Sequence, residues 1–285
     1  MCLFLSEMIM PTSPASAIVH AKGMDDLMKL QGPTFYSSGL SHHMFVGFRP
    51  VLVLQAFITR RKHLLSDHSW TSIPFSIYAA SPLQALFTEA FPLAAILERM
   101  DILQGFTIAQ AMPDAQQILE EILYIFQSLV HREQILHGEA ATHRWFPIFP
   151  AQSEQPIQFP SISVANYFTH LWAFQVICAD SIIKLLTRYP CLSTPKEIME
   201  PEELPSVEMI KQLACWCFRS IKFLIQKEFK LFGEASTSLI IKTYCDMFRA
   251  YGDDDPEMVF WYNRVSRILK GGSYPFLESL LGAAD

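Results

Sequence analysis

The segment from residue 161 to 188 constrains the fold most strongly, because it is apolar on most sides of a helix. Its charged residues are confined mainly to the last turns. The large apolar residues are Phe168, Leu171, Trp172, Phe174, Val176, Ile177, Ile182, Ile183, Leu185 and Leu186. A helix of this kind needs apolar neighbours around nearly its whole circumference. The segment therefore predicts a central helix surrounded by other helices.

The rest of the chain shows the same helical spacing, with proline and glycine between the periodic segments. No run of alternating polar and apolar residues competes with it. The predicted helices cover residues 2–10, 15–30, 39–60 with a break at Pro50, 82–100, 114–137, 161–188, 206–231, 234–250 and 256–270. At 285 residues and 51% apolar content, the chain can bury a continuous core. We expect an all-α fold, a single irregular multi-helix domain over residues 1–285.

Two segments interrupt the helical pattern. Residues 144–160 carry four prolines among aromatic residues, which excludes a regular helix and predicts an extended crossing with aromatic anchors. Residues 189–205 are rich in proline and acidic groups and are expected to form a solvent-exposed loop.

Composition excludes several classes of protein. A net charge of −6 argues against a surface built to hold nucleic acid. The six cysteines are scattered without a CxxC pair, which favours reduced core cysteines in a cytosolic or nuclear protein. The N-terminus lacks the pattern of a signal peptide. The apolar window at residues 73–97 is interrupted by prolines and Glu89, so we expect buried segments and no membrane span.

One histidine-rich stretch suggests a metal site, and its spacing argues against it. The stretch contains His131, Glu133, His137, Glu139 and His143. Steps of six residues rotate by about 240° on a helix, so the three histidines spread around the cylinder. We interpret Glu133/His137 and Glu139/His143 as i,i+4 polar pairs at a solvated helix end.

The acidic segment at residues 253–257 has the spacing DDxxE, which in all-helical terpene synthases holds magnesium ions against a diphosphate. It follows Gly252 and includes Pro256, which favours a loop that caps the next helix. A magnesium-dependent terpene-processing enzyme or a small-molecule binder that uses this loop remains the alternative function.

Other polar residues lack partners at useful spacing. His42, His43, His63 and His68 are interpreted as surface or core histidines, and the basic residues 60–63 as a C-terminal helix cap. The motifs GxSxG and GxGxxG and a P-loop are missing. We therefore predict no enzyme, and we assign no catalytic, cofactor-binding or metal-binding residue.

Several short motifs together resemble the regulatory region of fungal Zn(II)2Cys6 transcription factors. They are His20-x-x-Gly23-x-x-x-Leu27, Gln31-Gly32-Pro33, His43-x-Phe45-x-x-Phe48-Arg49-Pro50, Thr59-Arg60-Arg61, Trp70-x-x-Ile73-Pro74, Ser81-Pro82-x-x-x-Leu86, Phe159-Pro160-Ser161, Ala165-Asn166, Trp172 and Trp261. Read physically, Gly32-Pro33 ends a helix, and Arg49 would pair with a buried carboxylate or a helix terminus.

The resemblance implies a helical regulatory domain of a nuclear protein, with the cytoplasm as the alternative location. The six zinc-binding cysteines of the family's DNA-binding module have no counterpart here, so the chain resembles an N-terminally truncated member. It is expected to modulate gene expression through protein partners, including a full-length related factor, without binding DNA or membranes. The family often accompanies gene clusters for specialised metabolites.

Overall fold

Serine side chains begin three of the long helices. The hydroxyl oxygens of Ser81, Ser161 and Ser206 each accept a hydrogen bond from the backbone N–H three residues later. Each bond satisfies one of the amides that a helix leaves unpaired at its start. The expected helix start at Ser81-Pro82 is thereby confirmed.

The computed structural model describes residues 16–139, 145–194, 204–252, 254–272 and 274–282. Its α-helices are α2 (Ser16–Gln31), α3 (Gly39–Thr59), α4 (His68–Ser72), α5 (Pro82–Leu103), α6 (Ile108–Glu139), α7 (Ile162–Arg188), α8 (Val207–Leu224), α9 (Lys230–Tyr251), α10 (Pro256–Gly271) and α11 (Pro275–Gly282). Within these residues the structure has no β-strand, and its β-type backbone pairing is one isolated antiparallel bridge between Ile148 and Gln158. The all-α fold class is confirmed, and the helices form a single multi-helix domain.

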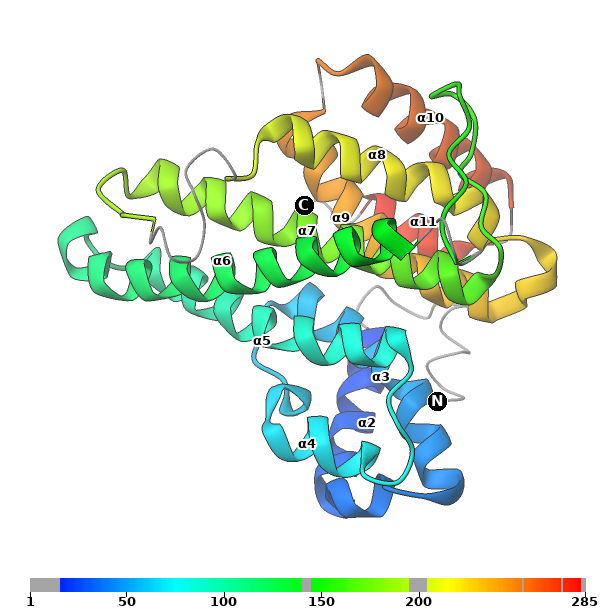
Figure 1. The fold of residues 1–285 in the computed structure, drawn as a ribbon, viewed down its shortest axis with the longest axis horizontal. Helices are drawn as coiled ribbons and strands as arrows, with labels where there is room; N and C mark the ends of the chain where they lie inside the picture. Colours follow the sequence, from blue (N-terminus) through cyan, green and yellow to red (C-terminus); the bar gives the residue numbers. More distant parts are fainter. Residues whose placement is uncertain (1–15, 140–144, 195–203, 253, 273, 283–285) are drawn as a thin grey trace.

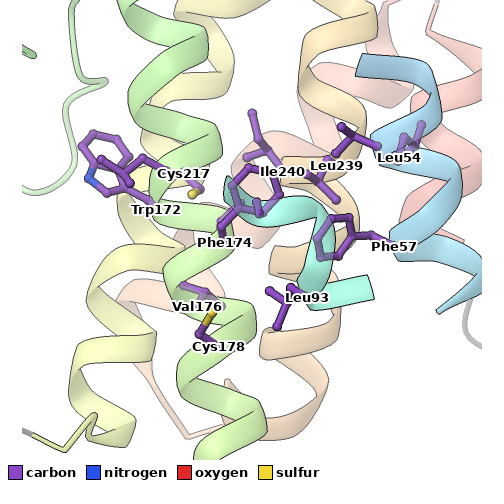
Figure 2. Packing of buried hydrophobic residues seen from close by; sticks show 14 of the residues in the cluster. Leu54, Phe57, Leu93, Trp172, Phe174, Val176, Cys178, Cys217, Leu239 and Ile240 are labelled. Carbon is purple, nitrogen blue, oxygen red and sulfur yellow. The ribbon is translucent and has the colours of Figure 1, made fainter. Parts of the chain in front are cut away.

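Helix α7 lies at the centre, as its apolar circumference predicts. It packs against α5, α6, α8 and α9. Figure 1 shows α6, α7 and α8 along the long axis of the molecule, with α2, α3 and α4 grouped to one side of them. The side chain of Phe174 on α7 meets residues from three other helices: Phe57 of α3, Leu93 of α5 and Ile240 of α9 (Figure 2). Its ring centroid lies 5.3 Å from that of Phe57.

The predicted helix boundaries near prolines and at one helix junction are wrong. Helix α3 runs through Pro50 without a break, and α6 begins at Ile108, before Pro113. The segment expected as one helix at 206–231 divides, because α8 ends at Leu224 and α9 starts at Lys230. Gly233 permits the close approach of these two helices, since an added Cβ there would lie 2.1 Å from the carbonyl oxygen of Leu224.

The described part of the segment at 144–160 contains no helix, as predicted, and its aromatic residues anchor it, but it is no extended crossing: it turns at residues 151–155 and folds back, so that Ile148 pairs with Gln158. Phe149 packs against Trp216 with ring centroids 4.9 Å apart, and Phe159 packs against Phe223 at 5.3 Å. Two backbone carbonyls of the segment also accept hydrogen bonds from Arg219. The predicted helix at 2–10 and most of the loop at 189–205 lie outside the described residues.

Candidate functional site

One candidate site is a cavity of about 740 Å³ between α3, α5, α7 and α9. Each of the four helices contributes residues to its wall, and Trp145 adds an aromatic ring. The wall is mostly apolar and contains no aspartate, glutamate, lysine or arginine. The site is thus enclosed by elements that are far apart in the sequence.

Two buried polar residues of the cavity wall lie about one turn apart on α7. Asn166 and His170 stand four residues apart, so they share one side of the helix. Both are buried, with exposed fractions of 2% and 4%. The Nδ1 atom of His170 lies 2.7 Å from the carbonyl oxygen of Asn166. A carbonyl oxygen only accepts hydrogen bonds, so Nδ1 carries the proton and Nε2 is left as an acceptor.

Burial keeps this histidine neutral. Desolvation lowers the pKa of His170 to about 4, and the hydrogen bond to the Asn166 carbonyl opposes that shift only in part. The Oδ1 atom of Asn166 has no hydrogen-bond partner among the described residues. Two residues of the cavity wall therefore carry an acceptor atom for which the described residues supply no donor, Asn166 (Oδ1) and His170 (Nε2).

A fully buried arginine lies beside the cavity. Arg49 donates to the backbone oxygen of Gln84 at 3.0 Å, to its Oε1 atom at 2.9 Å and to Thr88 Oγ1 at 2.8 Å. The rings of Phe45, Phe75 and Phe91 lie 5.1 to 5.7 Å from the guanidinium carbon. Of the two expected partners of Arg49, the carboxylate is not found, because these groups are neutral; the contact with Gln84, the third residue of α5, does lie at a helix terminus.

The same glutamine compensates for a hydrogen bond that α3 lacks at Pro50. Proline has no N–H, so the carbonyl oxygen of Val46, four residues earlier, loses its usual helical partner. The side-chain amide of Gln84 donates to that oxygen at 3.3 Å. A residue of α5 therefore supplies the hydrogen bond that Pro50 removes.

The histidine-rich stretch is an inter-helix contact and forms no metal site in the described residues. Glu133 accepts hydrogen bonds from Trp172 Nε1 at 2.8 Å and Gln175 Nε2 at 2.9 Å, both on α7. The expected pair with His137 is present at 3.8 Å. The expectation of a solvated end is wrong for Glu133, whose side chain is 14% exposed. The pair Glu139/His143 is not described, because the side chain of Glu139 and all of His143 fall outside the described residues.

The acidic segment before α10 caps that helix, as the sequence predicts. Asp255 Oδ1 accepts from the backbone N–H groups of Glu257 at 3.1 Å and Met258 at 3.0 Å. Its Oδ2 atom lies 3.4 Å from Lys211 Nζ. Asp253 lies outside the described residues. Across the described part of the chain, no group of three histidine, cysteine or acidic residues is arranged to hold a metal ion.

One histidine has a carboxylate neighbour that its own surroundings in the sequence do not reveal. The Nε2 atom of His63 lies 3.2 Å from Asp25 Oδ1, and Lys29 binds the other oxygen of Asp25 at 2.6 Å. Burial lowers the pKa of His63, Lys29 lowers it further, and Asp25 opposes both effects. His42 is buried against Phe75, as expected for a core histidine.

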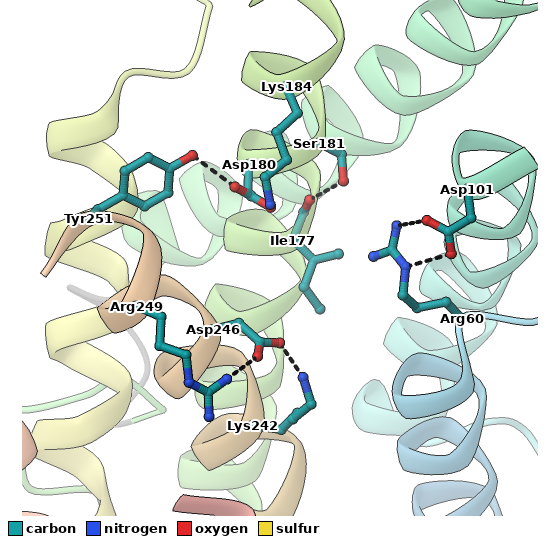
Figure 3. A network of polar contacts seen from close by, with 10 residues as sticks. All are labelled: Arg60, Asp101, Ile177, Asp180, Ser181, Lys184, Lys242, Asp246, Arg249 and Tyr251. Atoms are coloured by element: carbon teal, nitrogen blue, oxygen red, sulfur yellow. Dashed lines mark hydrogen bonds and ion pairs between the residues drawn. The ribbon is translucent and has the colours of Figure 1, made fainter. Parts of the chain in front are cut away.

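Basic residues after α3 bind carboxylates of α5. Arg60 forms a two-point contact with Asp101, at 2.8 and 2.7 Å (Figure 3). Arg61 lies 2.8 Å from Glu98. Arg60 is also the residue that ends α3, in a left-handed conformation. The basic residues expected to cap α3 thus also form ion pairs with α5.

The cysteines that the structure describes are free, and four of them are buried. Burial raises the pKa of Cys215 and of Cys245 to about 12, and it raises the pKa values of Cys178 and Cys217 as well. These four thiols are protonated at neutral pH and poorly reactive. Cys191 is exposed.

The cavity residues were missed in the sequence, although one signal for them exists. Asn166 and His170 are polar residues at i and i+4 on a helix that is otherwise apolar on most sides. Buried polar side chains need hydrogen-bond partners, so such a pair on an otherwise apolar helix marks a place to look for a polar contact or a cavity. Asn166 also belongs to the Ala165-Asn166 motif of the family resemblance, but that motif implies no role for its side chain.

Two further findings concern whether a helix could span a membrane and whether the chain is similar to known proteins. No described helix is both long enough and apolar enough to pass through a bilayer. Comparison of the chain with protein-family models, with curated proteins and with solved structures finds no significant match.

Proposed function

We propose that this chain is a transcription-factor-like regulatory protein that acts through contacts with protein partners, and that these 285 residues do not themselves hold DNA. The proposal includes a role in the nucleus, with the cytoplasm as the alternative, and a link to a gene cluster for specialised metabolites. A related full-length factor is the expected partner. The nuclear role, the link to a gene cluster and the expected partner are all drawn from the family resemblance.

The observation that carries the proposal is a set of exposed apolar side chains near the start of the described chain. Leu30 on α2 and Leu40 on α3 are 82% and 77% exposed. We call the whole set the α2–α3 stripe: Val19, Leu27, Leu30, Phe35, Leu40 and Met44. Its elements are in contact with one another. We propose that these side chains form one surface, since contiguous exposed apolar patches are typical of protein-binding sites.

Two further features support a scaffold that binds proteins. Arg60 and Arg61, which follow α3, are bound to carboxylates of α5 and so are less available to a phosphate backbone. The side chain of Asp255 is engaged in helix capping and a contact with Lys211, which disfavours the magnesium-dependent alternative.

Deletion of the gene in its host, followed by measurement of transcripts from neighbouring genes, tests the proposal. We expect changed transcript levels, restored by the wild-type gene and not by the double variant Leu30→Asp/Leu40→Asp. Tyr124→Asp is the matched control, because Tyr124 is 70% exposed on α6, outside the stripe. Unchanged transcripts after deletion would contradict the proposal.

A purified sample separates the regulatory role from the enzymatic alternative. Incubation with a prenyl diphosphate and Mg²⁺ is expected to give no product. Turnover that needs Mg²⁺ and disappears in Asp253→Ala/Asp254→Ala would establish the enzyme instead.

A further inference from the structure

We propose that the cavity between α3, α5, α7 and α9 binds an uncharged, mainly apolar small molecule that donates a hydrogen bond to Asn166 or His170. This inference goes beyond the proposed function, because a surface that binds proteins requires no internal cavity. It rests on the size of the cavity, the chemistry of its wall and the unpaired acceptors of two wall residues.

The size and the wall chemistry define the class of ligand. A volume of about 740 Å³ falls within the range of small-molecule sites, roughly 300 to 1,000 Å³. The residues that line it include no charged side chain, and burial keeps His170 neutral. A charged ligand would lose its hydration there without gaining an opposite charge. An uncharged molecule avoids that loss.

The unpaired acceptors of the wall residues Asn166 and His170 favour a ligand that carries a donor. Asn166 Oδ1 is without a hydrogen-bond partner in the described structure, and Asn166 is 2% exposed. An unpaired buried carbonyl is unfavourable, so a ligand that supplies an O–H or N–H group gains affinity there. His170 Nε2 provides a second acceptor on the same side of α7, because its Nδ1 proton is used by a backbone carbonyl.

Two other polar side chains in the wall, those of Gln84 and Ser236, already have partners. The Oε1 atom of Gln84 accepts from Arg49, and its Nε2 atom donates to the Val46 carbonyl. The hydroxyl of Ser236 donates to the carbonyl of Gly233. These groups are therefore less available to a ligand, and Asn166 and His170 are left as its main polar contacts.

The cavity is reached from solvent. Phe232 belongs to its wall and is 57% exposed, and Ser81 and Ser163 in the wall are also exposed. Other residues of the wall, among them Val51, Phe87 and His170, are buried. A small molecule can therefore enter between the exposed residues without displacing a core side chain.

Titration with N-phenyl-1-naphthylamine tests whether the cavity is a binding site. This probe is uncharged, carries one N–H donor and becomes fluorescent in apolar surroundings. We expect saturable binding of one probe per chain. Ala235→Trp places a large side chain in the wall and is expected to weaken binding at least tenfold. Ala250→Trp, an exposed position on the same helix, is the matched control and should bind like wild type.

A matched pair of competitors tests the donor requirement. 1-Naphthol should displace the probe roughly two- to tenfold more effectively than 1-methoxynaphthalene, which has no donor. In Asn166→Leu this preference should fall at least twofold while 1-methoxynaphthalene binds as before. His170→Phe provides a second test of the same loss, and thermal unfolding shows whether each variant is folded.

Three results would overturn the proposal: no saturable binding to the wild type, equal binding by the wild type and a folded Ala235→Trp variant, or an unchanged donor preference in both Asn166→Leu and His170→Phe. None of these measurements depends on gene expression. The cavity proposal and the regulatory role can therefore fail independently.

Discussion

Burial of His170 links the stability of the fold to pH. Its pKa is about 4 in the folded protein and about 6.5 when unfolded, so the unfolded state takes up a proton first as the pH falls. Its contribution to stability is present above pH 6.5 and is lost between about 6.5 and 4. The free energy of unfolding should fall by about 1 kcal/mol for each pH unit in this window.

Urea denaturation of the wild type and of His170→Phe measures this effect. The variant keeps an aromatic ring that does not titrate, so its stability should depend less on pH below about 6.5. His63, whose pKa is also lowered, contributes to both proteins and cancels in the comparison. Parallel pH profiles for the two proteins would show that His170 is solvated or charged in the fold.

Arg49 offers a second test at the scale of a single residue. Desolvation lowers its pKa to about 9, and the structure describes no carboxylate that compensates its burial. We expect Arg49→Met to keep the free energy of unfolding within about 1 kcal/mol of wild type, or to raise it. Arg49→Ala should lower it by about 3 kcal/mol, because it leaves a space among Phe45, Phe75 and Phe91.

Equal losses in the two variants would contradict that expectation. They would mean that the hydrogen bonds to Gln84 and Thr88 and the three ring contacts outweigh the desolvation of the charge. Chemical denaturation at neutral pH, where the guanidinium is protonated, distinguishes the two cases.

At the scale of the helix, the sequence predicted where the helices lie better than where they break or end near prolines. The spacing of apolar residues located segments such as 161–188 and 256–270 to within one residue of α7 and α10. The break expected at Pro50 was wrong for a reason outside α3. The donor that completes the helix belongs to Gln84, and local sequence carries no information about a side chain from another helix.

The contact between Gln84 and Val46 predicts a measurable coupling. Gln84→Leu removes the donor that the Val46 carbonyl needs when residue 50 is proline. In a Pro50→Ala background, the alanine N–H can form the ordinary helical bond to that carbonyl. The destabilisation by Gln84→Leu should therefore be smaller there by about 1 kcal/mol, measured by a double-mutant cycle in urea.

Pro113→Ala provides the matched control for this cycle. Pro113 also lies inside a helix and is exposed on α6, away from Gln84. Its effect should add to that of Gln84→Leu within about 0.5 kcal/mol. A coupling energy near zero for Pro50 with Gln84 would mean that the amide contributes little to the continuity of α3.

At the scale of the whole molecule, the central place of α7 was predictable and the cavity was not. A helix that is apolar nearly all round has to be surrounded, whatever the order of its neighbours. The cavity depends instead on how four helices leave space between them. Pairs such as Asp25 with His63 and Glu133 with Trp172 depend on that same packing, so residue spacing alone did not reveal them.

The position of Phe174 predicts that the whole molecule unfolds as one unit. Its ring is fully buried and lies among residues of α3, α5 and α9 (Figure 2). Phe174→Ala should lower the free energy of unfolding by about 3 to 5 kcal/mol. Fluorine NMR of protein labelled with 5-fluorotryptophan can follow Trp70 on α4 and Trp261 on α10 separately. Both signals should move to lower urea by the same amount.

This prediction is demanding, because two-state unfolding is expected mainly for domains shorter than about 150 residues. If the helices around Trp70 formed a separate unit, Phe174→Ala would shift Trp261 and leave the midpoint of Trp70 unchanged. Phe232→Ala, at a position that is 57% exposed, controls for the loss of a phenyl ring and should shift both midpoints little. Coincident shifts would make α7 the element through which the N-terminal and C-terminal helices stabilise each other.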